Sequence, residues 1–142
     1  MTEDTHEIRP VVIQEDACAW EGWDQSGRGG VRWRTLLSAD RTPTRSLTCG
    51  VSEIEPGRGG RFGAHRHAQT EVYYFLSGQG VMTIDGVDYP VRAGSTAFVP
   101  SHAKHGTRNT GAEPLRFFYV FTADSFAEVV YAFDGETPPS EG

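Results

Sequence analysis

The sequence is short of cysteine and of long apolar runs, and both shortages exclude classes of protein. Cys18 and Cys49 are its two cysteines, too few for a disulfide framework, so we expect free thiols in a reducing cytoplasm. No segment approaches the roughly 20 consecutive apolar residues of a membrane-spanning helix. The N-terminal MTEDTHEIRP is acidic and lacks an apolar core, which argues against a secretory signal. We therefore expect a cytoplasmic protein.

Basic residues are in the minority. Lysine and arginine total 13 against 19 aspartates and glutamates, which gives a formal net charge of −6. A protein of this charge has no general electrostatic attraction to nucleic acid or to anionic membranes, because both are negative themselves. We expect neither as a partner and expect a small-molecule substrate instead.

Long helical patterns are missing as well, and short strands take their place. No apolar period of 3.6 residues lasts long enough for a long helix. The 17 glycines and 8 prolines fall mostly between short runs, of which 31–36 and 47–52 alternate clearly. Asp85-Gly86, between two such runs, is a strong signal of a β-hairpin. About ten short strands indicate an all-β sandwich or barrel, and the pattern alone leaves both open.

The length of 142 residues suits one domain. We place this domain at 10–135, between a flexible N-terminal tail at 1–9 and a disordered C-terminal tail at 136–142. The apolar run at 10–13 is expected to form its first strand, at a sheet edge.

A homodimer is expected, because open β-sheets leave edges that a second copy can cover. Trp20 and Trp23 lie three residues apart and are expected to cover either an edge of the core or the dimer contact. The contact is therefore expected within residues 10–36.

The stretch from Gly59 to Gly78 carries the chemistry. His65 and His67 are two residues apart, so on a β-strand both side chains point to the same face. Residues 68–70 are long enough for a tight reversal, after which Glu71 is expected to open a returning strand opposite the histidines. Two imidazoles and a carboxylate that meet at one point form a facial metal site with open positions for substrate.

His105 is the fourth candidate ligand. Nitrogen and oxygen donors without a thiolate suit Fe(II), Mn(II), Ni(II), Co(II) or Zn(II), and affinity alone does not choose among these ions. We expect one divalent metal ion per chain, with about two positions of an octahedral ion left open for a guest.

Two stretches share fixed positions with a known family. The first reads G-x5-H-x-H-x3-E-x6-G and runs through Gly59, His65, His67, Glu71 and Gly78. The second runs through Gly94, Pro100, His102, His105 and Asn109. Both resemble signatures of the cupin superfamily, with His102 standing where the second signature usually has glycine. The resemblance implies a single cupin domain, an antiparallel double-stranded β-helix (jelly-roll β-barrel) with the metal inside its mouth.

Tyr73 and His102 are the candidate catalytic residues. Period two places Tyr73 on the same inward face as Glu71, where it is expected either to act as an acid or base or simply to fill the barrel. A ligand glutamate followed two residues later by tyrosine also resembles the cupin-type dimethylsulfoniopropionate lyases. His102 is expected either to shuttle protons at the mouth or to be a partly exposed loop residue.

The remaining aromatic and apolar runs are assigned to the core. Met82 and Phe98 are expected to line the barrel, as are Phe117, Tyr119 and Phe121 on one face of a later strand. Asn109 is expected to fix a turn. A largely apolar pocket with a metal suits a small organic acid or an aromatic ring.

The function indicated is that of a metal-dependent enzyme acting on a small organic acid or phenol. Dioxygenase, lyase and isomerase chemistry all remain open. The alternative is a non-catalytic ligand-binding or sensor barrel, and a third, metal-free dimerisation barrel is disfavoured by the intact ligand set.

Overall fold

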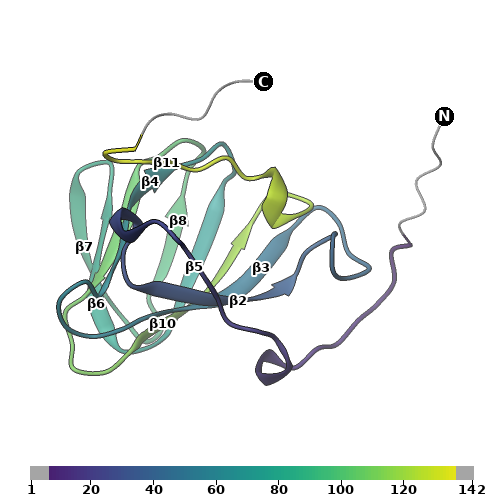
Figure 1. The fold of residues 1–142 in the computed structure, drawn as a ribbon, viewed down its shortest axis with the longest axis horizontal. Helices are drawn as coiled ribbons and strands as arrows, with labels where there is room; N and C mark the ends of the chain where they lie inside the picture. The colour runs from purple at the N-terminus through teal and green to yellow at the C-terminus, as the bar shows by residue number, and fades with distance from the viewer. Residues whose placement is uncertain (1–6, 137–142) are drawn as a thin grey trace.

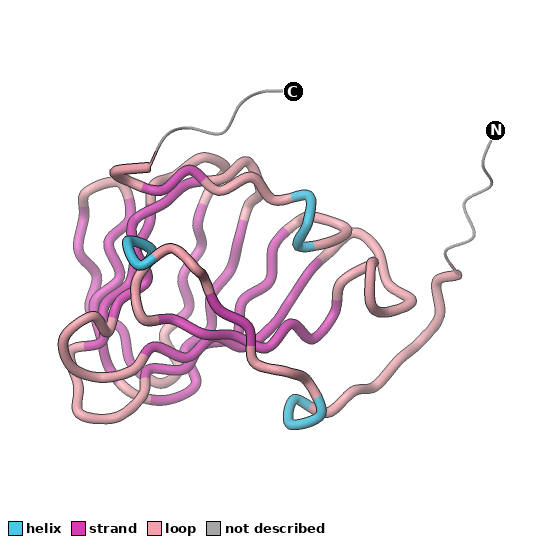
Figure 2. The backbone as a smooth tube through the Cα atoms, viewed as in Figure 1, coloured by secondary structure: helices cyan, strands magenta, loops and turns pink. Residues whose placement is uncertain are grey.

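The computed structural model describes residues 7–136, in which two antiparallel sheets pack face to face (Figure 1). Three short 3-10 turns interrupt the loops (Figure 2); these are η1 Glu15–Ala17, η2 Ser26–Arg28 and η3 Phe126–Glu128. The strands are β1 Glu21–Gly22, β2 Val31–Leu37, β3 Thr48–Ile54, β4 Arg61–Arg66, β5 Glu71–Ser77, β6 Gln79–Ile84, β7 Val87–Arg92, β8 Thr96–Val99, β9 His105–Asn109, β10 Leu115–Phe121 and β11 Ala132–Phe133.

The strand order is that of a jelly roll. One sheet has the order β1-β2-β3-β10-β5-β8 and the other β11-β4-β9-β6-β7. Consecutive strands such as β4 and β5 lie in different sheets, so the chain wraps around a common interior rather than meandering within one layer. The predicted all-β jelly-roll fold is confirmed. No helix among residues 7–136 has the length and apolar character needed to cross a membrane.

Local sequence explains the clearest elements. Asp85 and Gly86 both have positive φ, at 48° and 82°, and join β6 to β7 with Ile84 opposite Val87. This is the backbone that a two-residue hairpin turn needs, so the predicted hairpin is confirmed. In β2, alternate residues are buried against the other sheet, as the pattern at 31–36 predicted.

The interior is filled by large side chains from both sheets. Tyr73, Phe75, Met82 and the alternate residues of β10 are at most 4% exposed, which confirms that Met82, Phe117, Tyr119 and Phe121 line the barrel. Phe98 does not, and that prediction is wrong: its ring is 62% exposed. β8 pairs with β5 so that Val99 lies opposite Glu71, which turns Val99 inward and the neighbouring Phe98 outward.

The predicted strand at 10–13 is also wrong. These residues have no strand pairing, and Val12 is 91% exposed. The edge of the sheet beside β2 is covered by β1 instead. An apolar run predicts a strand only where a neighbouring strand offers backbone partners, and β1 already occupies that place.

The two tryptophans of the N-terminal segment have different surroundings. Trp20 lies beneath the guanidinium groups of Arg32 and Arg34, at 3.9 and 4.2 Å from its ring centroid. Trp23 packs against the buried core cluster. Both rings are therefore engaged within the chain, and the homodimer stays a prediction.

The predicted tails lie mostly outside the described residues, which leaves out 1–6 and 137–142. Glu136, the first residue of the predicted C-terminal tail, is described and forms an ion pair with Arg28 at 2.8 Å. The domain boundaries stay a prediction.

Candidate metal centre

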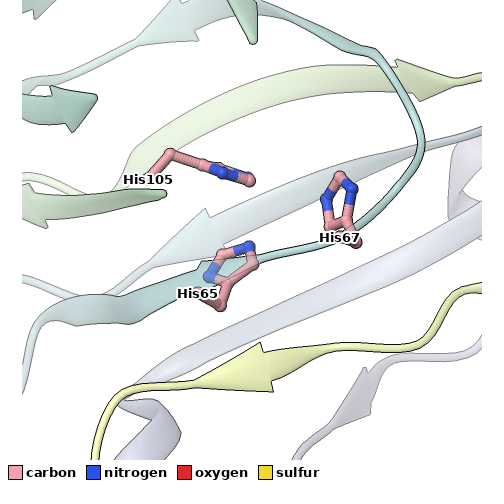
Figure 3. Close-up of side chains that lie close together, drawn as sticks. All are labelled: His65, His67 and His105. Carbon is pink, nitrogen blue, oxygen red and sulfur yellow. The ribbon is translucent and has the colours of Figure 1, made fainter. Parts of the chain in front are cut away.

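Three histidines from two strands and a loop meet inside the barrel. His65 lies in β4, His67 directly follows that strand, and His105 opens β9. One nitrogen from each lies within 4.8 Å of the others, and the three rings are directed toward a common space (Figure 3). All three side chains are at most 3% exposed. The structure thus brings together the histidines that the sequence singled out, in a group that could hold a metal ion.

A β-bulge explains how His65 reaches this position. In the pairing of β4 with β9, Phe62 lies opposite Thr107 and His65 lies opposite His105, so β4 carries one extra residue. Without this residue, strict alternation would turn Phe62 and His65 to opposite faces. The bulge lets both side chains point inward. In the sequence, only the glycine at position 63 marks the place of this bulge.

Glu71 comes from the opposite sheet. The reversal at 68–70 carries the chain from β4 to β5 across the barrel, so β5 does not pair with β4 as a hairpin partner would. Glu71 Oε1 lies 3.1 Å from His67 Nε2 and 3.3 Å from His105 Nε2. The carboxylate faces the histidines as expected, although it does so across the interior between two sheets.

Backbone carbonyl groups orient all three imidazoles. His65 Nδ1 lies 2.6 Å from the Gly63 carbonyl oxygen, His67 Nδ1 lies 3.0 Å from that of Gln69, and His105 Nδ1 lies 2.9 Å from that of Ala103. A carbonyl oxygen only accepts, so Nδ1 must donate in each pair. The unprotonated Nε2 atoms then face the shared interior, which is how a metal-binding histidine is usually held.

The unmet bonding of the Nε2 atoms indicates that a cation fits here. His65 Nε2 and His105 Nε2 are buried without a hydrogen-bond partner among the described residues. Both ring nitrogens of His67 face oxygen atoms, whereas a neutral imidazole has a single N–H. A second proton or a metal ion must therefore lie between His67 and Glu71, and a metal ion would satisfy all these donors together.

The electrostatics of the cluster agree with a cation-binding site. Burial, followed by the nearby His105, lowers the pKa of His65 well below its usual value, which keeps the imidazole neutral and able to bind metal. Burial by itself would raise the pKa of Glu71, but the nearby imidazoles of His105 and His67, with Nε2 atoms 3.3 and 3.1 Å from Glu71 Oε1, outweigh it and lower the net pKa. Glu71 is therefore a carboxylate.

Tyr73 lies one pleat along β5 from Glu71, on the same inward face. Its ring centroid is 6.1 Å from that of His105 and 4.3 Å from that of Phe117. Its hydroxyl makes no hydrogen bond to any residue in the described range 7–136. Burial, followed by the charge of Glu71, raises the pKa of this hydroxyl well above its usual value.

His102 lies apart from the cluster. Its side chain is exposed. Its backbone N–H donates a hydrogen bond to the His67 carbonyl oxygen at 2.8 Å. Its φ of 64° is in the left-handed region, which explains why glycine suits this position. Asn109 fixes a turn, as expected, by bonding Ile54, Glu113 and Gly111.

An aromatic wall beside the cluster was not predicted from the sequence. A cavity of about 20 Å³ adjoins Glu71 and Tyr73. Its other lining residues are almost all aromatic, and they are Trp23, Trp33, Ser52, Phe62, Phe117, Tyr119, Phe126 and Tyr131. Their side chains come from strands and loops throughout the chain, so spacing along the sequence does not connect them.

Comparisons of the sequence with a family model and with known proteins agree on one family. The family model described as Cupin domain matches residues 50–121. The chain is 39% identical over 124 residues to the dimethylsulfoniopropionate lyase DddW of Ruegeria pomeroyi, a match that covers 87% of this chain and 80% of that protein. It is 33% identical over 97 residues to an oxalate-binding protein of Thermotoga maritima, covering 68% of this chain and 78% of that one.

Solved structures agree with this fold. A predicted oxalate decarboxylase from Thermotoga maritima superposes with a TM-score of 0.69 at 30% identity, covering 80% of this chain and 99% of that one. A Bacillus subtilis oxalate decarboxylase, described with Mn(II) centres, gives a TM-score of 0.63 at 26% identity over 74% of this chain and 28% of that chain. Relatives of this chain thus include metal-containing enzymes that act on small carboxylates.

Proposed function

The chain belongs to the cupin family, and we propose that it is a divalent-metal-dependent lyase that cleaves dimethylsulfoniopropionate or a closely related sulfonium carboxylate. The observation that carries this proposal is the cavity beside Glu71 and Tyr73, which is enclosed by aromatic rings and lined by no lysine or arginine. The relative named for this lyase reaction supports it. The match with this relative covers all but about 18 of the 142 residues. It therefore includes the segment with Trp23 and Trp33, which lies before the region 50–121 that matches the family model.

We assign His65, His67, Glu71 and His105 as the residues that would hold the ion. Their donors are three nitrogens and one carboxylate oxygen, and the unpartnered Nε2 atoms of His65 and His105 support this assignment. When bound, a divalent ion supplies positive charge that polarises a substrate carboxylate and lowers the pKa of nearby hydroxyl groups.

The aromatic wall suits the other end of the substrate. A sulfonium carries a positive charge that cannot accept or donate a conventional hydrogen bond, and aromatic faces attract such cations. The rings of Trp23 and Trp33, with centroids 4.9 Å apart, and that of Phe126 form one side of the cavity. These rings also exclude water, which strengthens the attraction.

Tyr73 is assigned as the base. After the phenol has given its own proton to water, its phenolate oxygen takes the proton from the carbon next to the carboxylate, and the freed electron pair forms the carbon–carbon double bond. The bond from the next carbon to sulfur breaks with both electrons going to sulfur, so neutral dimethyl sulfide and acrylate leave. Because burial raises the pKa of the Tyr73 hydroxyl, this residue keeps its own proton until positive charge is present in the cluster. His102 is assigned no step, since its side chain is exposed.

The lining of the cavity suits other guests less well. Oxalate, the ligand named for one relative, carries two negative charges, and the cavity offers no basic side chain to receive them. Oxygen-dependent cleavage and isomerisation use similar ligand sets, so a measurement of the products must distinguish these reactions from the lyase reaction.

The test is a product assay under anaerobic and aerobic conditions. Protein loaded in turn with Mn(II), Fe(II), Co(II), Ni(II) or Zn(II) is mixed with dimethylsulfoniopropionate, and dimethyl sulfide and acrylate are measured. We expect equal amounts of both products, at rates independent of oxygen. Turnover that requires oxygen would identify an oxygenase. Binding of the compound without products under every metal would identify a binding barrel and overturn the proposal.

A further inference from the structure

Two segments close the cavity beside the histidine cluster, and both lie outside the part that matches the family model. The first, 20–30, precedes β2, and the second, 126–136, follows β10. Figure 1 shows the dark turn η2 of the first segment at the end of the sheet where β4 and the yellow β11 of the second segment lie. We call them the N-terminal strap and the C-terminal strap.

The straps bring aromatic rings directly onto the cluster. Tyr131 of the C-terminal strap has its ring centroid 5.4 Å from that of His65 and 5.3 Å from that of His67. The ring centroid of Trp23, in the N-terminal strap, lies 5.1 Å from that of Tyr131, and the two rings meet edge to face. Phe133 lies 4.8 Å from His65. The two straps therefore form one wall of the site together.

The cavity beside the histidine cluster is too small for the proposed substrate. A cavity of about 20 Å³ holds about one water molecule, whereas the proposed substrate has eight non-hydrogen atoms by its formula. The three histidines are at most 3% exposed and Glu71 is 4% exposed. Part of the wall must move before any organic guest, or a chelator, reaches the cluster.

One ion pair joins the straps. Arg28 donates from Nε and Nη2 to the two carboxylate oxygens of Glu136, at 2.9 and 2.8 Å. Apart from the side chain of Ser26, which the structure does not describe, no other hydrogen bond joins the described residues of the two straps. The Arg28 guanidinium also stacks on two rings, with its Cζ atom 4.4 Å from the ring centroid of Trp23 and 4.2 Å from that of Phe133. This two-pronged contact thus joins the two straps beside the ring contacts of Trp23 with Tyr131 and Phe133.

The backbone beside this pair can hinge. Gly135 precedes Glu136 with a φ of 80°, and a Cβ there would meet no atom within 4 Å, so the glycine serves the backbone conformation rather than packing. The C-terminal strap pairs with the sheet through Ala132 and Phe133 of β11, and Asp134 N–H donates to the Ala64 carbonyl oxygen at 3.0 Å. The part of this strap before β11, which carries Tyr131, has no strand pairing.

We propose that Arg28 and Glu136 form a latch that controls access to the metal centre. When the pair is formed, Trp23 and Tyr131 are held against the histidines and water is excluded. When it breaks, the straps separate and the guest enters or leaves. Arg28 and Glu136 are positioning residues, since they act through the aromatic rings. This proposal rests on the proposed function only for the identity of the guest.

The test uses variants of the latch and one matched control. Glu136→Gln keeps the shape of the side chain but removes its charge, and Arg28→Lys keeps the charge but loses the two-pronged geometry. The control is Glu53→Gln. Glu53 accepts from Arg32 at 2.9 Å while Arg32 stacks on Trp20 at 3.9 Å, which is the same chemistry away from the cavity.

Two readouts follow access directly. The first is the rate at which a chelator removes Mn(II) from the loaded protein, together with the Mn(II) dissociation constant. The second is hydrogen exchange of the two straps measured by mass spectrometry. For Glu136→Gln we expect release about tenfold faster, an unchanged dissociation constant because the ligands are untouched, and faster exchange in both straps together. Arg28→Lys should give a smaller change in the same direction, and Glu53→Gln none.

The outcomes separate this proposal from the proposed function. An unchanged release rate, faster exchange in only one strap, or an equal effect of Glu53→Gln would overturn the latch even if lyase turnover is found. Faster release and exchange in a protein without lyase activity would support the latch and count against the lyase. If the purified protein binds no Mn(II), exchange of the straps decides by itself.

Discussion

Replacing Tyr73 by phenylalanine removes one oxygen atom from the site, and the structure separates the chemical effect of this change from its structural effect. The hydroxyl bonds no residue of the described range, so its loss leaves no partner unsatisfied. The ring keeps its stacking on Phe117 at 4.3 Å and its edge contact with Phe75 at 6.0 Å. We therefore expect the free energy of unfolding to change by less than about 1 kcal/mol.

The expected effect on catalysis is much larger. Loss of a general base lowers rates by about 10²- to 10⁴-fold, which corresponds to about 2.7–5.4 kcal/mol of transition-state stabilisation. Metal content should be unchanged, because the phenol is not among the proposed ligands. Dimethyl sulfide release, metal per chain by mass spectrometry and the thermal unfolding midpoint are measured on the same preparation.

Tyr131→Phe is the matched control for this experiment. Tyr131 is the second phenol beside the histidines, with its ring 5.3 Å from that of His67, and we expect it to keep most of its turnover. Turnover of Tyr73→Phe within about threefold of the wild type would show that Tyr73 only fills space. Equal losses in both variants would show that the base is not Tyr73 alone.

Three further predictions concern stability and assembly. Mn(II) at a hundred times its dissociation constant should raise the free energy of unfolding by about 2.7 kcal/mol, and a chelator should reverse this in calorimetry. Burial raises the pKa of Glu15, but hydrogen bonds from Arg116 and Arg34 outweigh it, so the net pKa is lowered. The stabilisation from this carboxylate is then complete above about pH 4.5, where the unfolded chain has also lost the proton, and is lost as pH falls through the lower folded pKa; denaturant titrations should show a shallower acid loss for Glu15→Gln. The dimer contact predicted within 10–36 stays untested, and Phe98, 62% exposed on the edge strand β8, offers a different contact; if the chain pairs there, Phe98→Asp should halve the mass seen by light scattering while Val12→Asp leaves it unchanged.

The edges of the two sheets explain the choice of Phe98. β8 and β7 end their sheets on the same side of the barrel, and a cleft of about 730 Å³ opens between them. Its lining contains a single charged residue, Asp85, so two copies of this acidic chain would repel each other least there. The sequence placed the contact in 10–36 because of its tryptophans, but Trp23 packs on the core and Trp20 lies under two arginines. A mass that stays dimeric in Phe98→Asp would argue against this face.

The metal site was the most predictable part of the chain because its signal is local. His65 and His67 are two residues apart, and three residues separate His67 from Glu71. One strand and one short crossing between the sheets are therefore enough to bring these three side chains near each other. The bulge in β4 was not predictable, because a bulge depends on the register with β9, and a single glycine marks many other local structures. The prediction that Phe98 lines the barrel was wrong for a related reason. Its inward or outward direction depends on the pairing of β8 with β5, and a shift of one residue reverses the face.

The aromatic wall was not predictable because its members share no local pattern. Trp23 and Tyr131 are more than a hundred residues apart and come within 5.1 Å only after both straps fold over the same end of the barrel. The proposed ion-holding residues all lie within 50–121, the part that the cupin model matches, whereas Trp23, Trp33, Phe126 and Tyr131 lie outside it. In this chain the residues proposed to hold the ion and the aromatic residues proposed to hold the guest therefore lie in different parts of the sequence.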